Sequence, residues 1–81
     1  MDAGIIGENL IVGARQSIKA LKNGKALEVY IADDADESIK EEFISECMAR
    51  NIKIIRYGTM KELGRDCGID IGAAIACRIE K

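Results

Sequence analysis

The sequence predicts an α/β protein, a three-layer α/β/α sandwich with a four-stranded mixed sheet. Two observations support this fold class. Short apolar runs alternate along the chain with longer segments in which apolar residues recur every three or four positions, and these patterns are typical of buried strands and amphipathic helices. Strands that alternate with helices favour a sheet covered on both faces. The length of 81 residues allows one domain, which we expect to span residues 1–81.

The N-terminal third is expected to hold a short helix, a strand and a longer helix. Residues 2–9 fit the short helix, and Leu10–Val12 is an apolar run that fits a buried strand. The helix over Ala14–Lys22 places its apolar residues at i, i+4 and i+7, which is one face. Asn23 and Gly24 predict its end, because glycine readily adopts the left-handed conformation found after a helix.

The middle of the chain predicts a strand followed by the longest helix. Leu27–Ala32 is rich in Leu, Val, Tyr and Ile, which is typical of a strand buried on at least one face. An acidic turn follows, and its last residue, Asp36, is a good helix cap. The helix over Glu37–Arg50 has acidic residues early and Arg50 last, as the helix dipole favours, and Asn51 predicts its end.

The C-terminal third predicts a strand, a short helix and a final strand. Ile52–Tyr57 is an apolar run interrupted by two basic residues, and we expect it to be a strand. Thr59 and Glu62 have the spacing of a capping box, which starts a helix over Met60–Cys67. After a short loop, the small apolar residues of Ala73–Ile79 predict the last strand.

Composition argues against several classes of protein. The three cysteines, Cys47, Cys67 and Cys77, are far apart, no CxxC pair occurs and there is no histidine, which argues against a zinc site or a disulfide framework. Buried, unreactive thiols and a reducing cytoplasm are therefore expected. No apolar run approaches the roughly 18 residues of a membrane span. We expect no metal, no cofactor and no membrane partner.

The chain also lacks the residues that most enzymes need. It has no histidine for acid–base chemistry, no nucleophile elbow and no glycine-rich phosphate loop, so we expect neither catalysis nor a small-molecule substrate. The acidic turn of Asp33, Asp34 and Asp36 follows a strand, where α/β proteins often place their sites. It could hold a magnesium ion, but a helix cap in a solvated turn explains these residues without one.

Charge is distributed unevenly along the chain. The net charge is −2, but more than half of the acidic residues lie in residues 28–50, and the segments before and after are basic. A surface of this kind can hold a basic patch despite the acidic total.

The first long helix carries a cationic stripe. Arg15, Lys19 and Lys22 are spaced at i, i+4 and i+7, one position on from its buried face. Gly13 lets the helix begin directly after a strand, so that free backbone N–H groups face outward, as suits a phosphate. The amide of Gln16 can both donate to and accept from a base edge. The alternative is an ordinary solvated helix face whose lysines serve solubility.

A short apolar loop is the second unusual feature. Residues 68–72 read GIDIG, with Ile69 and Ile71 between two glycines in a segment too short for a strand. Apolar side chains on a loop are either packed into the core or presented to a partner. Both alternatives are open for this loop.

Four motifs together resemble a known family. GARQSIKALKNG, VYIADDAD, KELGRDCG and GAA occur in order at residues 13–24, 29–36, 61–68 and 72–74. With them the chain resembles, nearly end to end, the kink-turn RNA-binding ribosomal protein family of the large subunit, especially its small bacterial YbxF-type and YlxQ-type members. The resemblance implies an α/β/α sandwich that binds a kink-turn, an RNA helix bent sharply at a short bulge beside tandem sheared G·A pairs.

The resemblance also implies which residues contact the RNA. In the family, the start of the helix enters the groove at the G·A pairs, and an apolar-acidic-apolar loop covers the bulged nucleotides. With Lys22 added from the basic stripe, the implied positions in this chain are Gly13, Arg15, Gln16, Lys19, Lys22, Ile69, Asp70 and Ile71. Many members have Asn-Glu or Lys-Gln at the positions of Arg15 and Gln16, and the longer Arg shifts a base contact toward a phosphate. The implied partner is a ribosomal or regulatory RNA.

One alternative function belongs to a different class. The chain could be a protein-interaction adaptor whose working surface is the acidic helix over residues 37–50, with the basic stripe only solvated. Unstacked bases and distorted grooves are where proteins mostly read RNA sequence, so a helix start with Gln16 and Lys19 beside an apolar loop favours the RNA interpretation.

Overall fold

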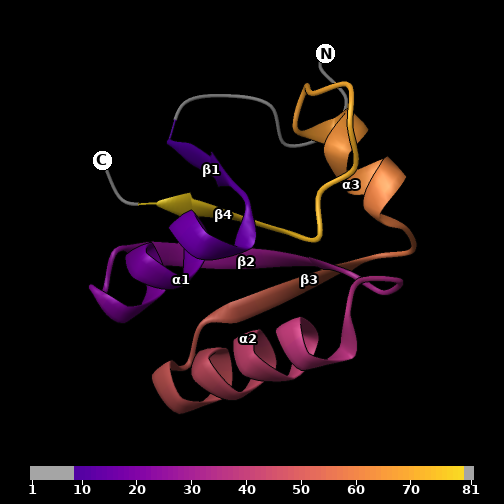
Figure 1. The fold of residues 1–81 in the computed structure, drawn as a ribbon. Coiled ribbons are helices and arrows are strands. Elements are labelled where there is room, and N and C mark those ends of the chain that lie inside the picture. The colour runs from indigo at the N-terminus through magenta and orange to yellow at the C-terminus, as the bar shows by residue number, and fades with distance from the viewer. Residues whose placement is uncertain (1–8, 80–81) are drawn as a thin grey trace.

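The structure, a computed structural model, describes residues 9–79 (Figure 1). Its elements are β1 (Leu10–Val12), α1 (Ala14–Lys22), β2 (Ala26–Ala32), α2 (Glu37–Arg50), β3 (Lys53–Tyr57), α3 (Met60–Asp66) and β4 (Ile75–Ile79). The α/β class predicted from the sequence is confirmed. The short helix expected over residues 2–9 lies, except for Asn9, outside the described residues.

The four strands form one mixed sheet in the order β1-β4-β2-β3. β2 and β3 are parallel, whereas β4 runs antiparallel to both β1 and β2. The register aligns rows of side chains across the sheet, and Val29 of β2 stands opposite Ile54 of β3 and Cys77 of β4. Because successive residues of a strand point to opposite faces, neighbouring rows contribute to two different core clusters.

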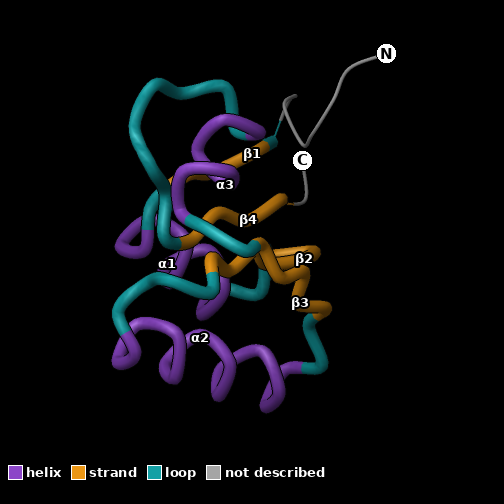
Figure 2. Tube along the Cα trace, turned by 90° about the vertical axis from the view of Figure 1, so that its right-hand side faces the viewer, coloured by secondary structure: helices purple, strands orange, loops and turns teal. Residues whose placement is uncertain are grey.

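Helices cover both faces of the sheet and give it three layers (Figures 1 and 2). α1 and α2 lie on one face, where Leu21, Phe43 and Cys47 pack with the row that contains Val29. α3 lies on the other face, where Leu63 packs with Tyr30 and small residues of β2 and β4. Val29 and Tyr30 are adjacent in the sequence and are both buried, on opposite faces, so β2 is the central element of both clusters.

Local signals in the sequence set most of the element boundaries. The Asp36 carboxylate accepts a hydrogen bond from the Ser38 backbone N–H at 2.9 Å, and the Thr59 hydroxyl accepts one from the Glu62 N–H at 3.0 Å. Asn51 ends α2 in the left-handed conformation, with φ of 59°. The predicted caps of α2 and α3 are therefore confirmed.

Two predicted boundaries were wrong near α3. Cys67 is the C-cap of α3 and not its last helical residue, and β4 begins at Ile75, two residues later than expected. The reason for the second difference is tertiary: the Ala73 N–H donates to the Met60 carbonyl at 3.0 Å. Ala73 is thereby bonded to α3 instead of the sheet.

Candidate nucleic-acid interface

The two segments predicted to form the site meet at one edge of the sheet. β1 ends at Val12, one residue before α1, and β4 begins at Ile75, three residues after the apolar loop of residues 68–72. These two strands are antiparallel neighbours, and the Gly13 N–H donates to the Ile75 carbonyl at 2.8 Å. The start of α1 is therefore held against the first residue of β4, four residues after Ile71 in the sequence.

Gly13 is required for its backbone conformation. Its φ is 113°, a value that favours glycine over residues with a side chain. A Cβ added there would meet nothing within 4 Å, so crowding is not the constraint. The positive φ turns the chain from β1 into α1 without an intervening loop.

α1 differs from the other two helices at its N terminus. No side chain caps α1, and its first turn has no acidic residue. By contrast, α2 and α3 each have a side-chain cap and an acidic residue in the first turn. The first N–H groups of a helix lack partners within the helix and carry partial positive charge. At α1 these groups remain available to an external acceptor such as a phosphate oxygen.

The cationic stripe on α1 is exposed. Arg15, Gln16, Lys19 and Lys22 are all exposed, while Leu21 and other residues of the opposite side of the helix are buried. None of the three stripe cations, Arg15, Lys19 and Lys22, forms an ion pair with a residue between 9 and 79. The three cations and the amide are free to contact a ligand along the outer side of α1.

The apolar loop presents one of its isoleucines, not two. The Ile71 side chain is 74% exposed, and Asp70 beside it is exposed. Ile69 was expected to face outward as well, but it is half-buried and packs against the core cluster on the α3 side of the sheet. Its backbone explains the difference, because the Ile69 N–H donates to the Gly64 carbonyl at 3.0 Å and so holds this residue against α3.

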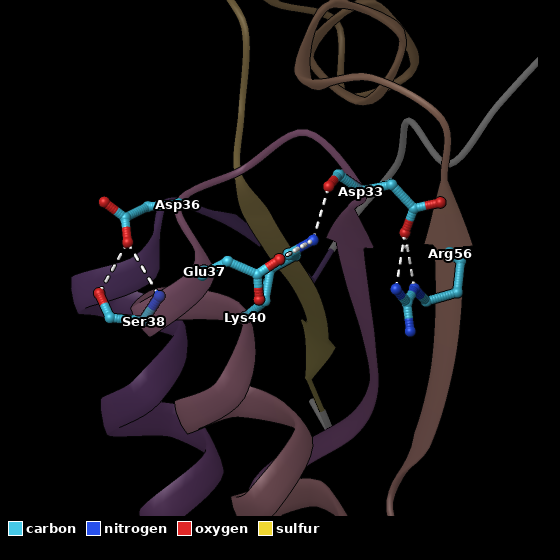
Figure 3. A network of polar contacts seen from close by, with 6 residues as sticks. All are labelled: Asp33, Asp36, Glu37, Ser38, Lys40 and Arg56. Atoms are coloured by element: carbon cyan, nitrogen blue, oxygen red, sulfur yellow. Dashed lines mark hydrogen bonds and ion pairs between the residues drawn. The ribbon is translucent and has the colours of Figure 1, made fainter.

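The acidic turn between β2 and α2 is held by its own contacts (Figure 3). Asp33 forms an ion pair with Arg56 at 2.8 Å, and Asp34 accepts a hydrogen bond from the Met60 N–H at 2.7 Å. Asp36 caps α2, and the hydrogen bond from the Ser38 hydroxyl, followed by that from the Ser38 N–H, lowers its pKa. The carboxylates face different partners, and no group of three metal-ligating side chains converges within residues 9–79.

Two basic residues of this edge were missed in the sequence analysis. Arg56 lies at the end of β3 and contacts Asp33, and Lys40 donates from α2 to the Asp33 carbonyl oxygen at 2.7 Å (Figure 3). Lys40 also pairs with Glu37 at 3.2 Å. The sequence indicates only one of these contacts locally, because Glu37 and Lys40 have the i, i+3 spacing of an ion pair on a helix. The contact between Arg56 and Asp33 links residues 23 positions apart in the sequence, whereas Lys40 is only seven positions from Asp33.

All three cysteines are buried and free. Burial raises the pKa of Cys47 to about 11, with smaller contributions from Cys77 and Glu46. Burial also raises the pKa of the other two thiols, although the Ser17 hydroxyl partly opposes this effect at Cys77. Protonated thiols shielded from solvent are poor nucleophiles, which fits the structural role expected for them.

Within the described part of the chain, no helix combines the length and the apolar character that a membrane span requires.

Comparison with known proteins gives a consistent result. Residues 6–81 match the model of the ribosomal protein L7Ae/L30e/S12e/Gadd45 family. An RNA-binding protein of Caldanaerobacter subterraneus is 49% identical over 69 residues, which cover 85% of this chain and 84% of that protein. The RNA-binding protein YbxF of Geobacillus stearothermophilus is 40% identical over 65 residues, or 80% of this chain and 79% of that protein.

Solved structures share the fold. The 15.5kD RNA binding protein of Giardia lamblia superposes with a TM-score of 0.83 at 27% identity, over 91% of this chain and 62% of that one. A protein of unknown function from Bacillus halodurans superposes with a TM-score of 0.81 at 25% identity, over 89% of this chain and 72% of that one.

Proposed function

Because the chain belongs to the ribosomal protein L7Ae/L30e/S12e/Gadd45 family, we propose that it is a non-catalytic protein that binds structured RNA. The similar proteins from Caldanaerobacter, Geobacillus and Giardia are named as RNA-binding proteins. The proposed partner is a ribosomal or regulatory RNA in the cytoplasm, where three buried free thiols would stay reduced.

One observation supports this function more than any other. The uncapped start of α1 is bonded through Gly13 to Ile75, and the exposed Ile71 lies four residues before Ile75 in the same connection to β4. The first offers N–H groups, cations and an amide, and the second offers an apolar surface. A ligand that presents phosphates, polar base edges and unstacked bases within a short distance satisfies both parts.

A kink-turn has these three features together. Its backbone phosphates suit the α1 N terminus with Arg15, Lys19 and Lys22, and its widened groove at the G·A pairs suits the amide of Gln16. Its bulged nucleotides are unstacked and suit the apolar side chain of Ile71, since RNA-binding proteins commonly recognise splayed bases. We therefore propose a kink-turn as the target, with Gly13 and Asp70 at the contact and Ile69 supporting the loop.

The adaptor alternative has less support from the structure. Of the acidic residues on α2, Glu37 pairs with Lys40 and Glu46 pairs with Arg50, both within the same helix. Such pairs are ordinary features of a solvated helix surface. They engage two of the four glutamates of α2 within the helix itself.

The proposal is tested by titrating the protein into two RNAs. One is a standard kink-turn, and the other is the same RNA with its G·A pairs replaced by Watson–Crick pairs. We expect the intact kink-turn to bind at least about tenfold more tightly, the discrimination that one good base contact supplies. Equal affinity for the two RNAs would contradict kink-turn recognition, and binding to neither would contradict the RNA function.

A further inference from the structure

We propose that Gly64 is a positioning residue for RNA binding, because its lack of a side chain lets the apolar loop lie directly against α3 and so determines where Ile71 is presented. This inference rests on the proposed function, since it concerns the loop assigned to the bulged nucleotides. It concerns a residue outside the surface described above, buried in α3.

The loop is bonded to α3 on both sides of Ile71. The Ile69 N–H donates to the Gly64 carbonyl, and the Ala73 N–H donates to the Met60 carbonyl, each at 3.0 Å. The two carbonyls are four residues apart and therefore about one helical turn apart along α3. Ile71 lies between the two anchors, and Figure 1 shows this segment running alongside α3 before it enters β4.

The approach between loop and helix is too close for a side chain at residue 64. A Cβ added to Gly64 would overlap the Ile71 carbonyl oxygen and would lie 3.0 Å from both the Ile71 carbonyl carbon and the Gly72 Cα. These are backbone atoms, so the overlap is not relieved by a change of rotamer. Any residue other than glycine at position 64 must displace the backbone of Ile71.

Gly72, in the loop, also lies close to α3, but a side chain at this position would be less crowded than one at Gly64. A Cβ there would lie 3.2 Å from the Met60 Cβ and 3.4 Å from the Met60 backbone. These distances are tight but need only a small adjustment of the loop. Alanine at position 72 should therefore displace the loop less than alanine at position 64, which gives a graded pair of variants.

The displacement should matter for binding because, within residues 9–79, the core does not hold the Ile71 side chain in place. Its side chain is 74% exposed, so packing against the core does not determine its position. The backbone contacts with α3 do so instead. A loop that is ordered before binding loses less conformational entropy when it contacts a ligand, and a shifted loop presents Ile71 away from the nucleotides.

The first part of the test needs no RNA. Amide hydrogen exchange is compared in the full chain for wild type, Gly64→Ala and Gly72→Ala. We expect Gly64→Ala to accelerate exchange at Ile69 and Ala73 strongly, and Gly72→Ala to do so less, while amides in the centre of β2 change little. Unchanged exchange at Ile69 and Ala73 in Gly64→Ala would overturn the proposal, whatever the protein binds.

The second part measures affinity for a kink-turn RNA below the melting temperature of every variant. We expect Gly64→Ala in the wild-type background to weaken RNA binding about tenfold, in the range of a lost interface anchor. In a protein that already carries Ile71→Ala, adding Gly64→Ala should reduce the affinity only slightly more, because the side chain that it displaces is already gone. Lys53→Ala serves as the control, because Lys53 is an exposed residue at the start of β3 and its replacement should leave affinity unchanged. An equal fold-loss from Gly64→Ala with and without Ile71, or no loss at all, would overturn the role in binding.

The outcomes separate the two proposals. If the wild type binds no kink-turn RNA, the proposed function fails, and the exchange measurement still decides whether Gly64 holds the loop. If Gly64→Ala does not fold, Gly72→Ala replaces it in both measurements with a smaller expected effect in the same direction.

Discussion

Lys19 and Gln16 lie one turn apart on the exposed side of α1 and carry different parts of the proposed contact. We expect Lys19→Ala and Gln16→Ala each to weaken RNA binding by about 1–3 kcal/mol, the range of a good direct contact to a base. Neither should lower stability much, because both side chains are exposed. A gel-shift titration of each variant against a kink-turn RNA measures the loss.

The matched control for this pair is Lys53→Ala. Lys53 is an exposed lysine at the start of β3, opposite Glu28, and thus at the end of the sheet away from the proposed surface. Lys40 would be a poor control because its ammonium group holds the Asp33 carbonyl. If Lys53→Ala reduces affinity as much as Lys19→Ala, the proposed surface is wrong.

Ile71 separates binding from stability more cleanly than any other residue of the loop. Because its side chain is 74% exposed, Ile71→Ala should change the free energy of unfolding by no more than about 0.5 kcal/mol, yet it should weaken RNA binding clearly. The loss should depend little on salt, since no phosphate charge is involved. The loss from Lys19→Ala should shrink as salt rises.

Thermal melts and RNA titrations at two salt concentrations test this expectation. Ile69→Ala is the companion variant, and it should lower the melting temperature because its side chain is half-buried against the core. A large fall in melting temperature for Ile71→Ala, with unchanged affinity, would show that the loop belongs to the core and not to the interface.

The buried thiol of Cys47 predicts a pH dependence of stability. Burial raises its pKa from 9.0 to about 11, so between these values the unfolded chain has lost a proton that the folded chain keeps. The stabilisation is fully present below about pH 9 and is lost as pH rises through about 11, by up to about 2–3 kcal/mol. The free energy of unfolding, measured with urea across this pH range, should fall less steeply with pH for Cys47→Ala than for wild type. Equal slopes for the two proteins would contradict the prediction.

At the scale of elements, α3 depends on its cap because it is short. The Thr59 hydroxyl accepts a hydrogen bond from the Glu62 N–H at 3.0 Å, and α3 spans only Met60–Asp66. Thr59→Ala should lower the free energy of unfolding by about 0.5–2 kcal/mol. Thr59→Ser should retain most of this stabilisation, because serine keeps the capping hydroxyl. Urea midpoints of the two variants measure the difference, and equal losses would show that the hydroxyl bond contributes nothing.

The elements that could be predicted from the sequence are those with local determinants. The apolar spacing of α1, the cap at Asp36 and the left-handed Asn51 each act within a few residues, and each was predicted. The start of β4 could not be predicted, because Ala73 is bonded to Met60, a residue in another element. The same limit explains Ile69, whose burial follows from the packing of the loop on α3.

The candidate site also has a part that could be predicted from local sequence and a part that depends on tertiary contacts. The cationic stripe of α1 could be predicted because one helix determines which of its residues share a face. That the start of α1 lies beside the start of β4 depends on the antiparallel pairing of β1 with β4, which links residues near the two ends of the chain. The partners of Asp33 at Arg56 and Lys40 depend on tertiary contacts as well.

For the molecule as a whole, the net charge of −2 does not describe the proposed surface. Two acidic residues near this edge are engaged by their own partners, Asp33 by Arg56 and Glu37 by Lys40. The cations of α1 have no such partners within residues 9–79. A local positive potential can therefore exist on an acidic protein.

The central claim is that RNA binds where the start of α1 meets the apolar loop. It is tested most directly by adding a kink-turn RNA to isotopically labelled protein and following every backbone amide by NMR. We predict that the amides of residues 13–19 and 69–72 shift together and saturate at one RNA per chain, while those of residues 45–50 at the far end of α2 stay unchanged. Shifts confined to residues 45–50, with residues 13–19 and 69–72 unaffected, would contradict the account.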